Sequence, residues 1–98
     1  MDSISFSWDD QKNATNRKKH KVSFEEAQSV FFDEEAIEYD DPDHSGSEER
    51  FLMLGLSYKA RILMVSFALR SKGSEIRIIS ARKATKKEQN IYINGVWR

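Results

Sequence analysis

The spacing of apolar residues changes from a helical period to a strand period about one third of the way along the chain. From Phe24 to Phe31, four apolar residues recur every three to four positions, which predicts a helix whose single apolar stripe packs against a sheet. Ser23 stands three residues before Glu26, the spacing of a capping box, and marks the start of this helix. From residue 36 onward, long segments alternate with a period of two, which is typical of strands.

Two further helices are predicted, one on each side of these segments. Asp9 or Asp10 can cap an earlier helix that extends to about His20, because a carboxylate accepts hydrogen bonds from the free amides of a first turn. Lys83–Tyr92 predicts a final helix. Asn94-Gly95 either ends this helix or begins a tail. The predicted strands are Ile4–Trp8, Ala36–Tyr39, Arg50–Ser57, Arg61–Arg70 and Glu75–Arg82.

The connections between the last three strands have hairpin length, so we expect these strands to be antiparallel neighbours. Arg61–Arg70 is apolar on both faces, which predicts a central position in the sheet. The order β-α-α-β-β-β-β-α predicts an α+β domain: an antiparallel sheet, two N-terminal helices packed on one face, and a C-terminal helix. We expect one domain over residues 1–98, with residues 93–98 as a candidate flexible tail.

Composition narrows the class of protein. The chain has 98 residues, 39% of them hydrophobic and 33% charged, which is enough apolar material for one modest core. The absence of cysteine excludes disulfides and thiolate metal sites, and two histidines do not make a convincing zinc site, so we expect no metal. The longest apolar run, Ile62–Val65, is far shorter than the ~20 residues that cross a bilayer. We therefore expect a small cytoplasmic protein with no membrane association.

The zero formal net charge conceals a strong asymmetry along the chain. Residues 24–50 carry eleven acidic side chains and one basic side chain, whereas residues 51–98 carry ten basic and two acidic ones. If the basic segments meet in the fold, they form a basic surface that attracts polyanions such as nucleic acid. The alternative is that the acidic block only neutralises its basic neighbours.

The first predicted helix has almost no apolar face. Lys12, Asn16, Lys19 and His20 fall at positions i, i+4, i+7 and i+8, so they share one face. Two ammonium groups, an amide and an imidazole on one face can bind a phosphate and move a proton near neutral pH. The alternative is a solvated helix whose lysine stems cover apolar neighbours.

Arginines stand at strand ends beside apolar faces. Regular alternation predicts that Ile76 and Ile78 share a face with Ser80 and Arg82. Arg61 begins another strand, and the residues that share its face of that strand are apolar. An arginine in this position holds a carboxylate or an anion with two hydrogen bonds, or forms a rim salt bridge worth about 0–1 kcal/mol.

Two stretches of the chain are distinctive in combination: a Trp-Asp…Asn-x-x-Lys-His opening and an Ile-Ile-Ser-Ala-Arg segment. They belong to a wider pattern over residues 6–92 that comprises Phe6-Ser7-Trp8-Asp9, Lys12, Asn16, Lys19-His20, Val22-Ser23-Phe24, Glu26-Ala27, Glu49-Arg50, Gly55, Arg61, Arg77 to Ala84, Glu88 and Tyr92. This pattern resembles that of the BrnT family of bacterial type II toxins.

The resemblance implies a RelE-like fold and a ribonuclease that blocks translation by cutting RNA. It also implies neutralisation by a BrnA-type antitoxin, with promoter DNA bound by the pair through the antitoxin. Carried onto this chain, the functional positions of the family fall on His20, Glu49, Arg61 and Arg82, with Lys19 beside them.

RNA supplies its own nucleophile, the 2′-hydroxyl, so the ribonuclease hypothesis requires neither a metal nor another cofactor. Arg61 and Arg82 are candidates to stabilise the pentacovalent phosphate. Glu49 or His20 is the candidate general base, with the other, or Lys19, assisting proton delivery. The candidate substrate-binding residues are Lys12, Asn16, Lys19, Arg77, Lys86 and Lys87. The alternatives are a module without catalytic activity that docks an acidic partner through its basic surface, and a domain that binds RNA without cleaving it.

Overall fold

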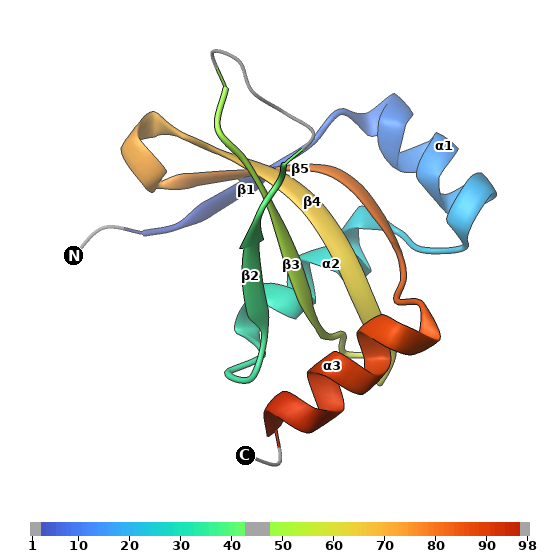
Figure 1. Cartoon of the computed structure of the whole chain (residues 1–98). Helices are drawn as coiled ribbons and strands as arrows, with labels where there is room; N and C mark the ends of the chain where they lie inside the picture. The colour runs from blue at the N-terminus through green and yellow to red at the C-terminus, as the bar shows by residue number, and fades with distance from the viewer. Residues whose placement is uncertain (1–2, 43–47, 97–98) are drawn as a thin grey trace.

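A computed structural model describes residues 3–42 and 48–96 of the chain, and the strands in these ranges form one five-stranded sheet (Figure 1). Their order across the sheet is β1-β5-β4-β3-β2, with the bounds β1 (Ser5–Ser7), β2 (Ile37–Asp40), β3 (Arg50–Leu56), β4 (Ile62–Arg70) and β5 (Glu75–Lys83). The α+β class is confirmed, and so is the central position of the strand that is apolar on both faces, β4.

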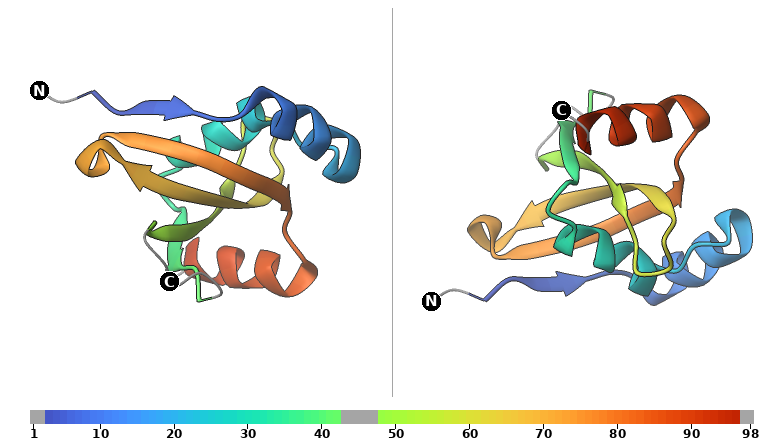
Figure 2. Two further views of the ribbon diagram at one scale, coloured as in Figure 1. Left: turned by 90° about the horizontal axis from the view of Figure 1, so that it is seen from above. Right: turned by 90° about the horizontal axis from the view of Figure 1, so that it is seen from below.

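Helices cover both faces of this sheet. The described ranges contain the helices α1 (Asp10–His20), α2 (Phe24–Ser29) and α3 (Lys86–Val96) and the 3₁₀ turns η1 (Val30–Phe32) and η2 (Ser71–Gly73). The helices α1 and α2 lie on one side of the sheet and α3 on the other (Figure 2), and we call the two sides the α2 face and the α3 face. None of these helices is long and apolar enough to cross a bilayer.

The sheet is mixed rather than wholly antiparallel. The four strands from β2 to β5 pair antiparallel as predicted, but β1 pairs parallel with β5 over Ser5–Ser7. Short hairpins force antiparallel pairing only among consecutive strands. The chain leaves β1 through two helices, so no hairpin constrains its direction, and the expectation of an antiparallel sheet is wrong at this edge.

A β-bulge interrupts β5 opposite β4. Phe67 is opposite Ile78, but the preceding residue of β4, Ser66, is opposite Ser80. Ile79 is therefore an extra residue with no partner on β4, and it reverses the alternation of side chains beyond it.

The bulge changes which residues share a face. Ile78 and Ala81 both pack in the core of the α2 face, although they are three residues apart. Arg82 is opposite Met64, whose side chain belongs to the smaller cluster beneath α3. The prediction that Ser80 and Arg82 share a face with Ile78 is therefore wrong, because it assumed an uninterrupted strand.

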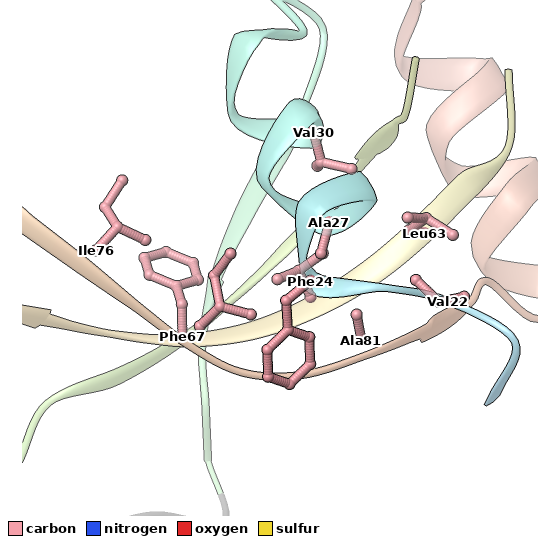
Figure 3. Close-up of a cluster of buried hydrophobic side chains, with 10 residues drawn as sticks. Val22, Phe24, Ala27, Val30, Leu63, Phe67, Ile76 and Ala81 are labelled. Atoms are coloured by element: carbon pink, nitrogen blue, oxygen red, sulfur yellow. The ribbon is translucent and has the colours of Figure 1, made fainter. Parts of the chain in front are cut away.

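The main core fills the space between α2 and the sheet (Figure 3). The predicted apolar stripe points into it, with Phe24, Ala27 and Val30 fully buried. A second, smaller cluster lies on the α3 face and joins Leu54, Met64, Ala84 and Tyr92. The buried residues of the main core are Val22, Phe24, Ala27, Val30, Leu63, Val65, Phe67, Ile76, Ile78 and Ala81.

The last helix begins and ends later than predicted. The strand β5 extends to Lys83, and Ala84 N still donates to Ile62 O at 2.9 Å, so the chain stays on the sheet until α3 begins. Asn94-Gly95 lies inside α3 instead of ending it. Of the expected tail, residues 93–96 are helical, and the last two residues of the chain lie outside the described residues.

Candidate functional site

Two buried asparagines hold the polar helix α1 on the protein. Asn13 Oδ1 accepts from Phe24 N at 2.9 Å, where α2 begins. Asn16 donates both amide hydrogens, to Val22 O and to Ala81 O at 2.8 Å each, and its oxygen accepts from Ala81 N at 3.2 Å. Because β1 pairs only with the first part of β5, the Asn16 amide takes the place of a neighbouring strand farther along that edge. The side-chain amide of Asn16, predicted to bind substrate, is therefore used by hydrogen bonds inside the fold, although the residue also lines the hollow beside α1.

Asn16 and the other predicted residues of this face line a hollow beside α1. This hollow has a volume of about 410 Å³, and its lining includes Lys12, Lys19, His20 and Ser80. Asp9 caps α1 by accepting from Gln11 N and Lys12 N, and these hydrogen bonds hold the pKa of Asp9 below its usual value. The predicted face of α1 thus exists, with two ammonium groups and one imidazole available to a ligand.

A second hollow of about 100 Å³ is lined by His20 and Ser80 as well. Because these two residues line both hollows, the hollows are adjacent, and we call them together the His20 groove. Its sheet side is formed by the side chains of Leu52, Met64, Ser66, Ser80 and Arg82 on the α3 face and by Ala81.

The hydroxyls of Ser66 and Ser80 stand opposite each other on adjacent strands, in the floor of the His20 groove. Neither has a hydrogen-bond partner among the described residues, so both can bind a ligand. Sequence reasoning missed these serines and their apolar neighbour Leu52. The available signal was a hydroxyl residue in the middle of the long apolar strand β4.

Arg82 is held at the edge of this groove by a carboxylate from α3. Its Nη1 donates to Glu88 Oε1 at 2.7 Å and its Nη2 to Glu88 Oε2 at 3.0 Å. The hydrogen bonds from Arg82 are the main reason that the pKa of Glu88 falls to about 2, and the same contact raises the pKa of Arg82. The pair therefore remains charged throughout the neutral pH range.

Arg61 lies on the other side of the sheet. Its Nε donates to Glu26 Oε2 at 2.9 Å, its Nη2 donates to Glu26 Oε1, and Nη2 also donates to Lys21 O at 3.0 Å. Burial opposes the charged form of Glu26, but hydrogen bonds from Arg61 and Ser57 outweigh it and hold the Glu26 pKa below its usual value. The prediction that Arg61 joins His20 and Arg82 in one pocket is wrong, because a fully buried carboxylate holds its guanidinium on the α2 face.

Glu49 is not part of the His20 groove either. It precedes β3 and lines a different hollow with the residues of the β4–β5 turn, Ser71 to Gly73. It stands three residues along the chain from Leu52, roughly 10 Å for extended backbone. The structure therefore does not bring Glu49 together with His20. A single site made of all four predicted residues would require these two side chains to be close.

The remaining predicted residues lie around the groove without lining it. Arg77 precedes the bulge on β5 and shares the α3 face with Ser80 and Arg82. Lys86 and Lys87 are exposed in the first turn of α3, next to the Arg82–Glu88 pair. Within residues 3–42 and 48–96, no group of three or more histidine, aspartate or glutamate side chains is placed to hold a metal ion.

Comparison with known proteins identifies a family and a similar solved structure. The family model for "Ribonuclease toxin, BrnT, of type II toxin-antitoxin system" matches residues 8–88. The crystal structure of the Brucella abortus ribonuclease toxin BrnT matches with a TM-score of 0.64 and 21% identity, covering 86% of this chain and 100% of that one. No curated protein sequence matches the chain.

Proposed function

The chain belongs to the BrnT family of ribonuclease toxins of type II toxin–antitoxin systems, and from this premise we propose that it is a metal-independent endoribonuclease whose active site is the His20 groove. The observation that carries the proposal is the convergence of His20, Arg82 and two serine hydroxyls on one groove beside two lysines, the hydroxyls having no partner among the residues that the structure describes. Imidazole and guanidinium groups supply the proton transfer and the anion stabilisation that cleavage of an RNA phosphodiester requires.

In the proposed reaction, the RNA 2′-hydroxyl attacks its own 3′-phosphate. His20 accepts the proton of that hydroxyl as the new P–O2′ bond forms, and Arg82 binds the charge that develops on the phosphate oxygens. The P–O5′ bond breaks, and the leaving 5′-oxygen takes a proton from the Lys19 ammonium. The products are a 2′,3′-cyclic phosphate and a 5′-hydroxyl, and solvent restores the protonation states of His20 and Lys19.

Basic residues around the groove bind the rest of the RNA in this proposal. Lys12 binds a flanking phosphate on the α1 side, while Lys86 and Lys87 bind phosphates on the α3 side. Arg77 extends the same basic surface along β5.

In the cell, we expect cleavage to inhibit translation in the cytoplasm and a BrnA-type antitoxin to neutralise it. The pair would bind its promoter DNA through the antitoxin. The family's type II toxin–antitoxin assignment supports a protein antitoxin as partner.

The test uses the purified chain and a short RNA. We expect cleavage to persist in EDTA, to leave cyclic phosphate ends, and to disappear when a 2′-deoxy residue replaces the nucleotide before the cleaved bond. Inducing the chain in bacteria should stop growth, and co-expression of a BrnA-type antitoxin should restore it. A chain that binds RNA, leaves it intact and is tolerated by cells would instead be an interaction module, and the proposal would fail.

A further inference from the structure

The Arg82 guanidinium uses only one of its two hydrogen-bonding edges within the protein. The edge formed by Nη1 and Nη2 faces the Glu88 carboxylate, and Nη1 also donates to Lys83 O at 3.3 Å. The Nε–H group has no hydrogen-bond partner among the described residues. A guanidinium can bind a carboxylate through one edge and a phosphate through the other. Arg82 lines the groove and its side chain is 41% exposed, so one edge of its guanidinium remains for an anion.

Glu88 is itself fixed in place by the start of α3. Its Oε1 accepts from Thr85 N at 2.9 Å, and its backbone N donates to Thr85 Oγ1 at 3.2 Å. This is a reciprocal capping box, so the carboxylate that binds Arg82 cannot rotate freely.

A second contact anchors α3 one helical turn further on. Tyr92 Oη donates to Asp33 Oδ2 at 2.7 Å, and Leu56 N donates to the same oxygen at 2.8 Å. Burial and the Asp33 carboxylate raise the pKa of Tyr92, so this hydroxyl stays protonated. The helix is therefore held at both the Glu88 and the Tyr92 turns, which makes it a rigid support for Arg82.

We propose that Glu88 is a positioning residue for RNA cleavage: it binds one edge of Arg82 and thereby aims the free Nε edge at the phosphate in the His20 groove. The inference rests on the proposed function and deepens it. The competing explanation is that Glu88 only caps α3. Both explanations predict a less stable Glu88 variant, so the test must separate the cap from the contact with Arg82.

Two single variants make this separation. Glu88→Gln keeps an oxygen for Thr85 N but loses the charged fork, and we expect kcat to fall about tenfold or more with a smaller change in KM, because misplacement of a reacting group costs rate. Thr85→Ala removes the hydroxyl half of the capping box and leaves the Arg82–Glu88 pair, so we expect kcat to change less than twofold. Thermal melting followed by circular dichroism checks that both variants fold.

A double-mutant cycle provides the second readout. Arg82→Lys keeps a positive charge but removes the planar fork, so adding Glu88→Gln to it should lower kcat less than twofold further. Equal losses of kcat in Glu88→Gln and Thr85→Ala, an unchanged kcat in Glu88→Gln, or fully additive losses in the cycle would each overturn the inference.

A measurement independent of cleavage separates this inference from the proposed function. The ¹⁵N–¹H signal of Arg82 Nε, assigned by its absence in Arg82→Lys, should shift when a non-cleavable 2′-deoxy dinucleotide is added to the wild type and should shift much less in Glu88→Gln. A wild-type chain that cleaves no RNA refutes the proposed function. A shift equal in both proteins refutes the positioning role whether or not RNA is cleaved.

Discussion

Arg61 and Arg82 lie on opposite faces of the sheet, each bound through both oxygens of a different glutamate. Arg61 binds Glu26, a fully buried carboxylate on α2, whereas Arg82 binds Glu88 on α3 beside the His20 groove. Two arginines that sequence patterns treat alike therefore have different tasks: Arg61 neutralises a charge in the interior, and Arg82 faces a groove open to solvent.

Substituting these two arginines should separate stability from catalysis. Arg61→Ala leaves the buried Glu26 carboxylate without its cation, and we expect the free energy of unfolding to fall by about 3–5 kcal/mol. Arg82→Ala should abolish RNA cleavage and growth toxicity while the purified protein stays folded. Urea denaturation and a cleavage assay on folded protein measure the two effects.

The double variant Glu26→Gln/Arg61→Gln controls for the loss of charge. It leaves no unpaired charge in the interior, so it should recover part of the stability that Arg61→Ala loses and should cleave RNA at nearly the wild-type rate. If the folded double variant is inactive, or if Arg82→Ala cleaves normally, the separation of the two roles is wrong.

The features that local sequence determines could be predicted, and those that depend on contacts across the fold could not. The periods of the apolar residues, the helix-capping side chains and the short hairpins are local, and they predicted the strands, α1 and α2 to within one or two residues. The Ile79 bulge depends on register between β4 and β5, which no single segment encodes. One inserted residue was enough to place Arg82 on the face opposite to the one predicted.

The composition of the site shows the same limit. The shared face of Lys12, Lys19 and His20 follows from helical spacing and was predicted. The hydrogen bonds of Asn16 to Ala81 join residues 65 positions apart, and those of Arg61 to Glu26 join residues 35 apart. A polar residue whose hydrogen bonds are made to residues far along the chain has the same local sequence pattern as one that is free to bind a ligand. The Thr85-x-x-Glu88 spacing, in contrast, was available and indicates the true start of α3.

Replacing Asn16 should destabilise the fold rather than change substrate binding. Asn16→Ala removes three hydrogen bonds and leaves Val22 O and the backbone of Ala81 without partners, so we expect the free energy of unfolding to fall by about 2–4 kcal/mol. The neighbouring Thr15→Ala is the matched control, because Thr15 is exposed on the same helix, and it should change stability by less than about 0.5 kcal/mol. Equal stability of the two variants would show that Asn16 does not anchor α1.

Stability should decrease in acid in a window set by Glu88. Its pKa is lowered from 4.5 to about 2 in the folded protein, so its contribution is fully present above about pH 5 and is lost as the pH falls through the folded value. Because the Arg82–Glu88 pair is partly exposed, solvent screens it, and its contribution to the free energy of unfolding is about 1–2 kcal/mol. Urea unfolding between pH 7 and pH 3 should therefore show a stability difference between wild type and Glu88→Gln that shrinks as the pH falls below 4.5. A difference that is independent of pH would contradict the assignment of the lowered pKa to the Arg82 contact.

Removing positive charge from the α1 side of the groove should weaken RNA binding in a salt-dependent manner. Lys12 and Lys19 line the His20 groove, whereas Lys18 is exposed on the same helix but does not line it. Each phosphate contact to single-stranded nucleic acid contributes a slope of about −0.7 to the dependence of log K on log salt. The double variant Lys12→Gln/Lys19→Gln should therefore reduce the magnitude of that slope by about 1.4. Lys18→Gln should leave it nearly unchanged.

Fluorescence anisotropy with a 2′-methoxy RNA, which cannot be cleaved, measures binding without the reaction. At low salt we expect the double variant to bind at least about tenfold more weakly than the wild type, since two charge-assisted contacts are lost. The free energy of unfolding should stay within about 0.5 kcal/mol per substitution, because both lysines are exposed. An equal loss of affinity in Lys18→Gln would mean that net charge, not the groove, attracts the RNA. An unchanged slope in the double variant would place the RNA on another surface, and the α1 side of the proposed site would have to be abandoned.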